Sequence, residues 1–250
     1  MSNYDTVILD IEGTITPITF VKETLFPYVT SGLSAFLDRT WDTPELKSQV
    51  ELLRAQAKKD VQDNVEHALL IPSETEASTE EVKDAVIKTI NWQMKADRKI
   101  GALKSFQGFM WKEGYESGEL RGVVYDDVIP ALEKWKSAGK TVYIYSSGSV
   151  PAQKLLVGYS TKGDLMHFFS GYFDTSVGLK TESQSYKNIA KLINKENDTN
   201  SILFVTDNIN EIFPSSEAGY QVVISSRPGN APLGPESEQF KIVTSFDQIQ

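Results

Sequence analysis

Three short apolar runs, each ended by small or acidic polar residues, restrict the possible folds of this chain more than any other feature. The runs are TVILDIEGT (6–14), TVYIYSSGS (141–149) and SILFVTDN (201–208). Short apolar runs that end in turn residues are typical of buried parallel strands. Helical patterns follow the second and third runs, and another apolar run, QVVISS (221–226), comes after the last helix. This alternation predicts an α/β fold with a Rossmann-like, doubly wound parallel sheet.

Two further amphipathic helices are predicted directly before the second and third strands. In the helix over 127–140, Asp127 is placed to cap the start and Gly139 to end the last turn. The helix over 183–195 is opened by a serine, Ser183, which is a favoured residue at helix starts. Both helices then feed a strand, as a βαβ arrangement requires.

The stretch between the first and second strands has a different pattern. Its apolar spacing is helical, and we expect helices over 43–66, 79–100 and 102–117. An insertion of roughly a hundred residues is too long for a simple connection. We therefore predict a helical cap over 20–122, inserted into an α/β catalytic core made of 1–19 and 123–250.

The composition favours a soluble intracellular protein with a sizeable core. The chain has 250 residues, is 40% hydrophobic and contains no cysteine. The missing cysteines exclude a disulfide framework, a thiolate zinc site and a cysteine nucleophile, and they suit a reducing compartment. The first residues, MSNYDTVILD, do not resemble a signal peptide, and no apolar run is long enough to cross a bilayer.

The formal charge argues against nucleic acid as a partner. The net charge is −9, and no cluster of lysine and arginine rises above this acidic background. An acidic protein binds an anionic substrate only where local cations or backbone N–H groups reverse the field. Histidine chemistry is scarce as well, because only His67 and His167 are present, and we expect both to have structural or surface roles.

Polar residues follow each of the three predicted strands. Because ligands of open α/β sheets bind beyond the carboxyl ends of the strands, these residues should converge although they lie far apart in the sequence. Lys180, in a loop just before a predicted helix, can reach the same place. The strand-end residues are Asp10 and Glu12, Ser146 and Ser147, and Asp207 and Asn208.

These residue types suit magnesium and phosphate. Mg²⁺ prefers oxygen ligands and keeps several waters, so Asp10, Asp207 and a main-chain carbonyl near Glu12 would hold it. Ser147 and the N–H groups that follow it can accept a phosphoryl group at a helix start, while Lys180 supplies a point charge. Asp10 would then attack phosphorus to form an aspartyl-phosphate, and Glu12 would protonate the leaving oxygen and later activate water.

The same residues resemble the four motifs of the haloacid-dehalogenase superfamily of aspartate-nucleophile phosphatases. The motifs are DIEGT, the strand end YIYSSGS, the loop lysine and FVTDN. Longer stretches resemble the enolase-phosphatase family of methionine salvage, in which Glu replaces the more common Asp at the position of Glu12. These stretches include VILDIEGTITPITFVKETLFPY, WQMKADRKIGALKSFQGFMW, KTVYIYSSGSVPAQKLLVGYSTKGDL, FDTSVGLKTESQSYKNIA and RPGNAPL.

This resemblance implies a specific activity. It implies an enzyme with one Mg²⁺ per chain that enolises 2,3-diketo-5-methylthiopentyl 1-phosphate and then dephosphorylates it to the acireductone 1,2-dihydroxy-3-keto-5-methylthiopentene. It further implies a monomer whose partner is a small-molecule phosphate ester, located in the cytoplasm and additionally in the nucleus. Carried over residue by residue, it places Mg²⁺ at Asp10, Glu12 and Asp207, and the substrate at Ser146, Ser147 and Lys180.

The fourth motif departs from the pattern of many relatives, which carry two adjacent acids. Here Asn208 follows Asp207, and the next acid is Glu211, so the role of Glu211 stays open. For the aromatic stretch FQGFMWKEGY (106–115), with Trp92 and Met94, we expect packing between helices, and part of it could line a pocket for the methylthio tail.

Three alternative functions remain from the residues alone. The chain could be a Mg²⁺-dependent phosphatase for another small phosphate ester, or a metal-free dehalogenase on the same fold. It could also be a non-catalytic interaction module, since fold does not imply function. Asp207 and Lys180 beside the carboxylate pair favour the metal-dependent enzyme.

Overall fold

The computed structural model describes residues 4–249, and the chain forms two compact units. The first, called the core unit, comprises Met1–Thr24 and Tyr115–Gln250, and the second, called the helical unit, comprises Leu25–Gly114. The predicted cap, 20–122, is a few residues wider than the helical unit at both ends. The residues in excess cluster with the core unit.

The core unit contains one parallel sheet with β1 near its centre. The strand order is β3-β2-β1-β4-β5-β6, and every neighbouring pair is parallel. The predicted doubly wound sheet is therefore confirmed, but β3 and β6, with 3 residues each, are too short to be predicted. The strands are β1 Thr6–Leu9, β2 Thr141–Tyr145, β3 Gly171–Phe173, β4 Ile202–Thr206, β5 Gln221–Ser225 and β6 Lys241–Val243.

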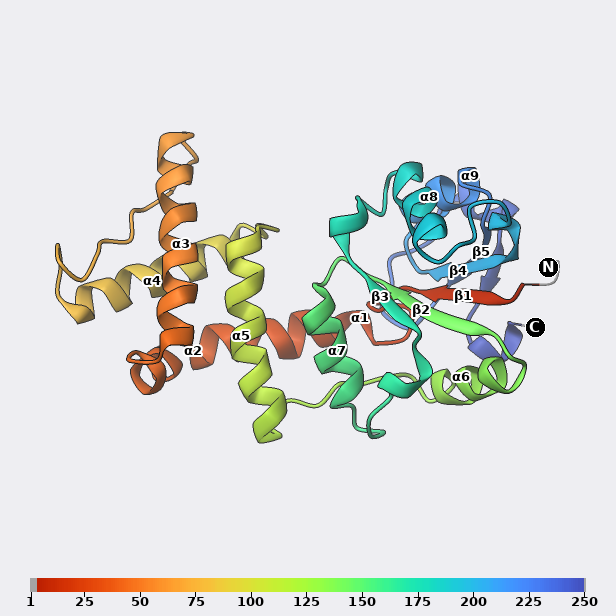
Figure 1. The fold of residues 1–250 in the computed structure, drawn as a ribbon, viewed down its shortest axis with the longest axis horizontal. Helices are drawn as coiled ribbons and strands as arrows, with labels where there is room; N and C mark the ends of the chain where they lie inside the picture. The colour runs from red at the N-terminus through yellow and green to blue at the C-terminus, as the bar shows by residue number, and fades with distance from the viewer. Residues whose placement is uncertain (1–3, 250) are drawn as a thin grey trace. The chain divides into compact units, whose positions relative to one another are not determined.

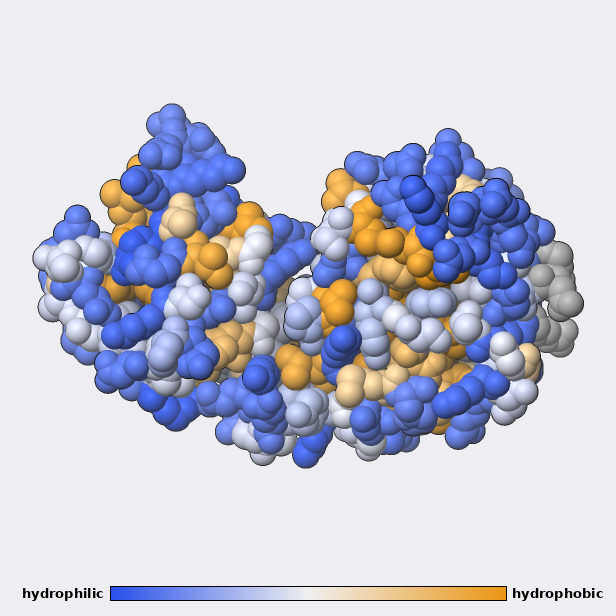
Figure 2. Space-filling view, in the orientation of Figure 1, coloured by the Kyte–Doolittle hydropathy of each residue, from blue (hydrophilic) through white to orange (hydrophobic). Residues whose placement is uncertain are grey.

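Helices cover both faces of this sheet. Figure 1 shows α8 and α9 on one face and α6 and α7 on the other. In the space-filling view, mainly hydrophilic residues cover α8 and α9 on the visible side (Figure 2). The helices of the core unit are α1 Ile18–Phe20, α6 Val128–Ser137, α7 Val150–Gly158, α8 Ser183–Leu192 and α9 Ile209–Glu217. Short helical turns occupy Val21–Leu25, Met166–Phe168, Thr175–Val177, Thr199–Ser201, Pro235–Gln239 and Phe246–Gln248.

An aromatic cluster joins α8 to the middle of the sheet. The ring of Tyr186 on α8 packs edge to face against Tyr145 of β2 at 5.6 Å and against Phe204 of β4 at 5.3 Å. All of these side chains are fully buried. Such aromatic pairs add roughly 0.5–1.5 kcal/mol beyond the burial of their area. The cluster therefore fixes the helix that follows the Lys180 loop.

The helical unit contains the three predicted helices and a further one, over Phe26–Thr40, that was not predicted. Its helices are α2 Phe26–Thr40, α3 Pro44–Gln62, α4 Thr79–Lys95 and α5 Gly101–Ser117, the last of which runs into the core unit. Ser78 and Glu81 form a capping box at the start of α4. The aromatic stretch packs between helices as predicted, because Phe36 of α2 lies edge to face against both Phe106 and Phe109 of α5.

Two predicted helix caps are wrong. Asp127 makes no capping hydrogen bond to α6, because its Oδ2 accepts from Arg227 Nη1 at 2.7 Å and from the Phe246 N–H at 2.6 Å. The residue before α8 is Glu182 rather than Ser183, whose buried hydroxyl has no hydrogen-bond partner. Asp127 is thus taken up by tertiary hydrogen bonds, and Ser183 is the first residue of its helix rather than the capping residue before it. Gly139 ends the α6 region with φ of 73°, as predicted.

A buried ion pair in the helical unit leads to a stability prediction. Asp60 accepts hydrogen bonds from Arg98 Nη2 at 2.8 Å and from Gln56 Nε2 at 2.7 Å, and its side chain is only 3% exposed. We expect Asp60→Asn to lower the free energy of unfolding of this unit by about 3 kcal/mol, because Arg98 would keep its charge without its partner. Asp84→Asn, which removes an exposed ion pair with Lys88, should change it by less than about 0.5 kcal/mol.

The effect should depend on pH. The hydrogen bond from Arg98 lowers the pKa of Asp60, so its stabilisation is complete above the unfolded-state pKa of about 3.9 and is lost as pH falls further. Urea unfolding followed by tryptophan fluorescence measures this, since Trp41, Trp92 and Trp111 lie in the helical unit. A difference between Asp60→Asn and wild type that persists undiminished to about pH 2 would contradict it.

Candidate active site

A pocket of about 470 Å³ lies at the carboxyl ends of β1, β2 and β4. It lies where the strand order reverses, since the chain adds β2 and β3 on one side of β1 and β4, β5 and β6 on the other. The predicted convergence is therefore observed. All the residues expected at the site line the pocket, and so does Glu211: Asp10, Glu12, Ser146, Ser147, Lys180, Asp207, Asn208 and Glu211.

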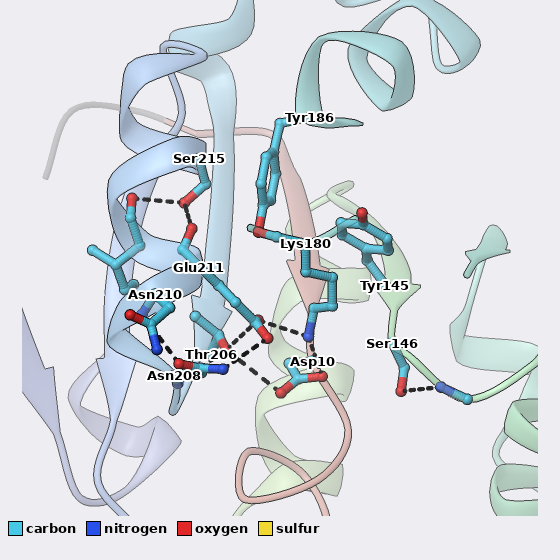
Figure 3. Close-up of polar contacts among 12 residues, drawn as sticks. Asp10, Tyr145, Ser146, Lys180, Tyr186, Thr206, Asn208, Asn210, Glu211 and Ser215 are labelled. Carbon is cyan, nitrogen blue, oxygen red and sulfur yellow. Dashed lines mark hydrogen bonds and ion pairs between the residues drawn. The ribbon is translucent and has the colours of Figure 1, made fainter. Parts of the chain in front are cut away.

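Lys180 links two buried carboxylates at the base of the pocket. Its Nζ lies 2.6 Å from Asp10 Oδ1 and 2.7 Å from Glu211 Oε2, and no side chain of the three is more than 9% exposed (Figure 3). Burial lowers the pKa of Lys180, but the charges of Asp10 and Glu211 outweigh burial and raise this pKa above its ordinary value. The lysine is thus a fixed cation beside Asp10.

Glu211, whose role the sequence left open, lines the pocket and pairs with Lys180. It lies in the first turn of α9, where Thr206 Oγ1 donates to its Oε2 at 2.7 Å and Asn208 Nδ2 approaches its Oε1 at 3.3 Å. Burial and the charge of Asp10 raise the pKa of Glu211, while Lys180 lowers it. The available signal was the spacing of three residues from Asn208, the residue that caps α9, because a capping residue and the third residue of a helix lie close together.

In the loop that carries Lys180, each carbonyl from residue 177 to residue 180 accepts a hydrogen bond from a side chain. Gly178 in this loop has φ of 130°, and a Cβ there would collide with Ser185 Oγ. The donors come from β2 and α8, and no local sequence pattern indicates this role for them. Asn188 donates to the Val177 carbonyl at 2.9 Å, Tyr145 to Gly178 at 2.9 Å, Ser185 to Leu179 at 2.7 Å and Tyr186 to Lys180 at 2.6 Å.

The two serines follow β2 in a turn that leads into α7. Ser146 is buried, and its Oγ accepts from the Gly148 N–H at 3.3 Å, whereas Ser147 is exposed at the pocket. The first helical N–H, of Val150, donates to Asp174 Oδ2 at 3.0 Å. The N–H of Val150 therefore already has an acceptor within the protein, and the turn around Ser147 is the part of this segment that lines the pocket.

The acids of the pocket outnumber its basic residues. Asp10, Glu12, Asp207 and Glu211 line it with Lys180 as the one basic residue among the described residues of its wall. Burial, followed by the charges of Asp10 and Glu211, raises the pKa of Asp207 to about 7. A divalent cation at Asp207 would offset this excess of negative charge.

The donor set fits magnesium with a main-chain contribution. Within residues 4–249, no three acidic or histidine side chains form a ready metal-ligand cluster. The expected ligands need no such cluster, because Asp10 and Asp207 supply carboxylates, a main-chain carbonyl near Glu12 supplies a third oxygen, and waters complete the shell of Mg²⁺.

Residues without a predicted site role lie elsewhere. His67 and His167 are both exposed, in agreement with the expected surface roles, and neither lines the pocket.

In the part of the chain that the structure describes, every helix is too short or too polar to traverse a bilayer.

Comparisons with known proteins agree with this geometry. Residues 4–219 match the family model of the haloacid dehalogenase-like hydrolases. Enolase-phosphatase E1 of Danio rerio is 44% identical over 245 residues, which are 97% of this chain and 93% of that protein. The UTR4 protein of Saccharomyces cerevisiae, a solved structure, is 35% identical, with a TM-score of 0.77 and coverage of 99% of this chain and 100% of that one.

A plant relative is longer. The probable bifunctional methylthioribulose-1-phosphate dehydratase/enolase-phosphatase E1 of Populus trichocarpa is 50% identical over 243 residues, which are 97% of this chain and 46% of that protein. The chain thus spans about half the length of such plant relatives. The resemblance found in the sequence is confirmed, and the chain belongs to the haloacid dehalogenase-like hydrolases and, within them, to the enolase-phosphatase E1 family.

Proposed function

We propose that the chain is a Mg²⁺-dependent enolase-phosphatase of methionine salvage. It enolises 2,3-diketo-5-methylthiopentyl 1-phosphate and then removes phosphate to give the acireductone. The observation that carries the proposal is the pairing of Asp10 with Lys180 at 2.6 Å in a pocket that Glu12, Ser147 and Asp207 also line. The names of the relatives support the choice of substrate.

Asp10 is the nucleophile in this proposal. Lys180 holds the Oδ1 end of its carboxylate, which orients the group and offsets repulsion from the incoming phosphate. Ser146 and Ser147 bind the phosphoryl oxygens from the end of β2. The phosphorus–oxygen bond to the leaving group breaks as the bond to Asp10 forms, which gives an aspartyl-phosphate.

Glu12 is the general acid and base. It lies two residues after Asp10 on the same turn and lines the same pocket. It donates a proton to the leaving oxygen and then accepts one from the water that hydrolyses the aspartyl-phosphate. One residue can perform both steps, because the carboxylate formed in the first step is the base needed in the second.

One Mg²⁺ per chain is part of the proposal. Asp10, Asp207 and a main-chain carbonyl near Glu12 would hold it, and it would neutralise charge on the phosphoryl oxygens. Ile18, Ile209 and Leu233 form apolar parts of the pocket wall, which suits a substrate with an apolar tail. We take the protein to act as a monomer in the cytoplasm, with the nucleus as an additional location.

A single-turnover experiment tests both half-reactions. The chain with Mg²⁺ is mixed with the diketo phosphate, the enol is followed by its absorbance, and phosphate release is assayed in parallel. We expect the enol signal to rise and then to decay as phosphate appears. Phosphate release without any enol signal would leave only the alternative, a phosphatase for another small ester. Absence of both the enol signal and phosphate release from a folded protein with Mg²⁺ present would overturn the proposal.

Glu12→Gln separates the two steps. We expect phosphate release to slow by roughly 10²–10⁴-fold, because the leaving oxygen loses its proton donor. Enol formation should slow less, since it needs mainly oxyanion stabilisation by Lys180 or Mg²⁺, so the enol phosphate should accumulate. Glu238→Gln, an exposed acid outside the pocket, is the control and should behave as wild type. Loss of the enol signal itself in Glu12→Gln would make Glu12 the base that abstracts the carbon-bound proton.

A further inference from the structure

The turn that follows Asp10 is held by three donors from distant parts of the core unit. Its successive carbonyls each accept one hydrogen bond. Asn230 Nδ2 donates to Gly13 at 2.9 Å, Arg227 Nε to Thr14 at 3.1 Å and the Tyr125 N–H to Ile15 at 3.0 Å. Two of these donors are side chains of one segment, Arg227–Leu233, whose last residues line the pocket.

The orientation of the Asn230 amide is fixed. Its Nδ2 donates to the Ser225 carbonyl at 3.2 Å as well as to Gly13, and two carbonyl acceptors require the NH₂ end of the amide on that side. Its Oδ1 is buried without a hydrogen-bond partner. The donor end of the amide therefore ties β5 to the turn. Its acceptor end lies against Gly13, on the side where Asp207 also lies.

Asn230 and Asp207 meet at Gly13. Gly13 has φ of 74°, and a Cβ built there would lie 3.0 Å from Asn230 Oδ1 and would collide with Asp207 Oδ2. Both side chains thus close against the same side of the Gly13 backbone. Gly13 follows Glu12 directly, so any shift of this contact moves the Glu12 carbonyl relative to the Asp207 carboxylate.

Arg227 anchors the segment that carries Asn230. Its guanidinium is buried between the rings of Tyr125, at 4.5 Å, and Phe246, at 4.7 Å. Its Nη1 donates to Asp127 Oδ2 at 2.7 Å and to the Thr244 carbonyl at 3.1 Å. Because these contacts hold Arg227 in place, Asn230 in the same segment keeps a fixed position relative to both the sheet and the turn.

We propose that Asn230 is a positioning residue for magnesium, which it serves by holding the Asp10–Glu12 turn in register with Asp207. The inference rests on the proposed function for the identity of the cation. Residues that orient metal ligands without touching the metal typically contribute 10- to 100-fold in metal affinity, because the ligands otherwise reorganise on binding. Asn230 would act in the same way, through the backbone of Gly13.

Magnesium affinity tests this directly. We expect Asn230→Ala to weaken Mg²⁺ binding, measured by titration calorimetry without substrate, by about 10- to 100-fold. Amide hydrogen exchange at residues 12–16 should become faster, and kcat should fall more than KM rises, because the substrate contacts remain. A merely structural role would lower the melting temperature and leave the Mg²⁺ affinity of the folded protein unchanged.

Two further variants complete the test. Gln221→Ala removes an amide-to-carbonyl hydrogen bond of 2.6 Å to Asn200 outside the pocket, and should leave Mg²⁺ affinity unchanged. Arg227→Lys keeps a cation for Asp127 but loses the Nε bond to Thr14, and should weaken Mg²⁺ binding by about 3- to 10-fold, even if Asn230→Ala fails to fold.

The outcomes distinguish this inference from the proposed function. Mg²⁺ affinity within twofold of wild type in both Asn230→Ala and Arg227→Lys would overturn the positioning role. A wild-type protein that binds no Mg²⁺ would instead overturn the proposed function. In that case, faster exchange at residues 12–16 in Asn230→Ala would still support the hold of Asn230 on the turn.

Discussion

Asp10→Asn is expected to lower the rate of phosphate release by about 10⁴-fold or more, as for the removal of other enzyme nucleophiles. The neutral amide is a poor nucleophile, and one oxygen ligand of the proposed magnesium site is lost. The fold should survive, because the side chain keeps its size and Lys180 keeps its ion pair with Glu211 at 2.7 Å. The measurement is single-turnover phosphate release with Mg²⁺, with circular dichroism to verify folding.

The control for this prediction flanks the same strand at its other end. Asp5, just before β1, is an exposed acid that pairs with Lys195, so Asp5→Asn removes a carboxylate at the opposite end of the strand. Its activity should match that of wild type. Deamidation of the introduced asparagine would restore aspartate and has to be excluded by mass spectrometry. More than a tenth of wild-type turnover in pure Asp10→Asn would take the nucleophile role away from Asp10.

The arrangement of the site could be predicted where strand ends determine it. Asp10, Ser146 and Asp207 each follow an apolar run, and parallel strands bring their carboxyl ends to one edge of a sheet. The apolar runs that mark these strands are local features of the sequence, so they can be recognised without the structure. Lys180 was found because a loop before a helix that packs on the same sheet has little freedom to lie elsewhere.

The supporting contacts could not be predicted, because they depend on tertiary structure. Nothing in the local sequence tells that Tyr186 donates to the Lys180 carbonyl or that Asn230 donates to Gly13. Asp127 illustrates the same limit. Its position favoured a helix cap, but a buried Arg227 far along the chain offers a charged partner, and a charge-assisted hydrogen bond is the stronger interaction.

Lys180→Met is expected to have the second large effect, on the free energy of unfolding. The substitution keeps an unbranched side chain but removes the cation that pairs with Asp10 and Glu211, whose side chains are at most 9% exposed. Removing one partner of a buried ion pair typically costs roughly 3–5 kcal/mol, because the remaining charge is buried without compensation. Lys187→Met, on the exposed side of α8, is the matched control and should change the free energy of unfolding little.

The pH dependence of this loss identifies its cause. Burial already raises the pKa of Glu211 although Lys180 lowers it, so without the lysine this pKa should rise further. An acid with a raised folded-state pKa binds more protons folded than unfolded, so the folded state of Lys180→Met loses stability as pH rises. In EDTA-containing buffer, the difference from wild type should therefore be largest near pH 7 and shrink as pH falls toward about 4.3, the unfolded pKa of Glu. Urea unfolding at several pH values measures it, and a difference that does not vary with pH would mean that lost packing, not uncompensated charge, destabilises the variant.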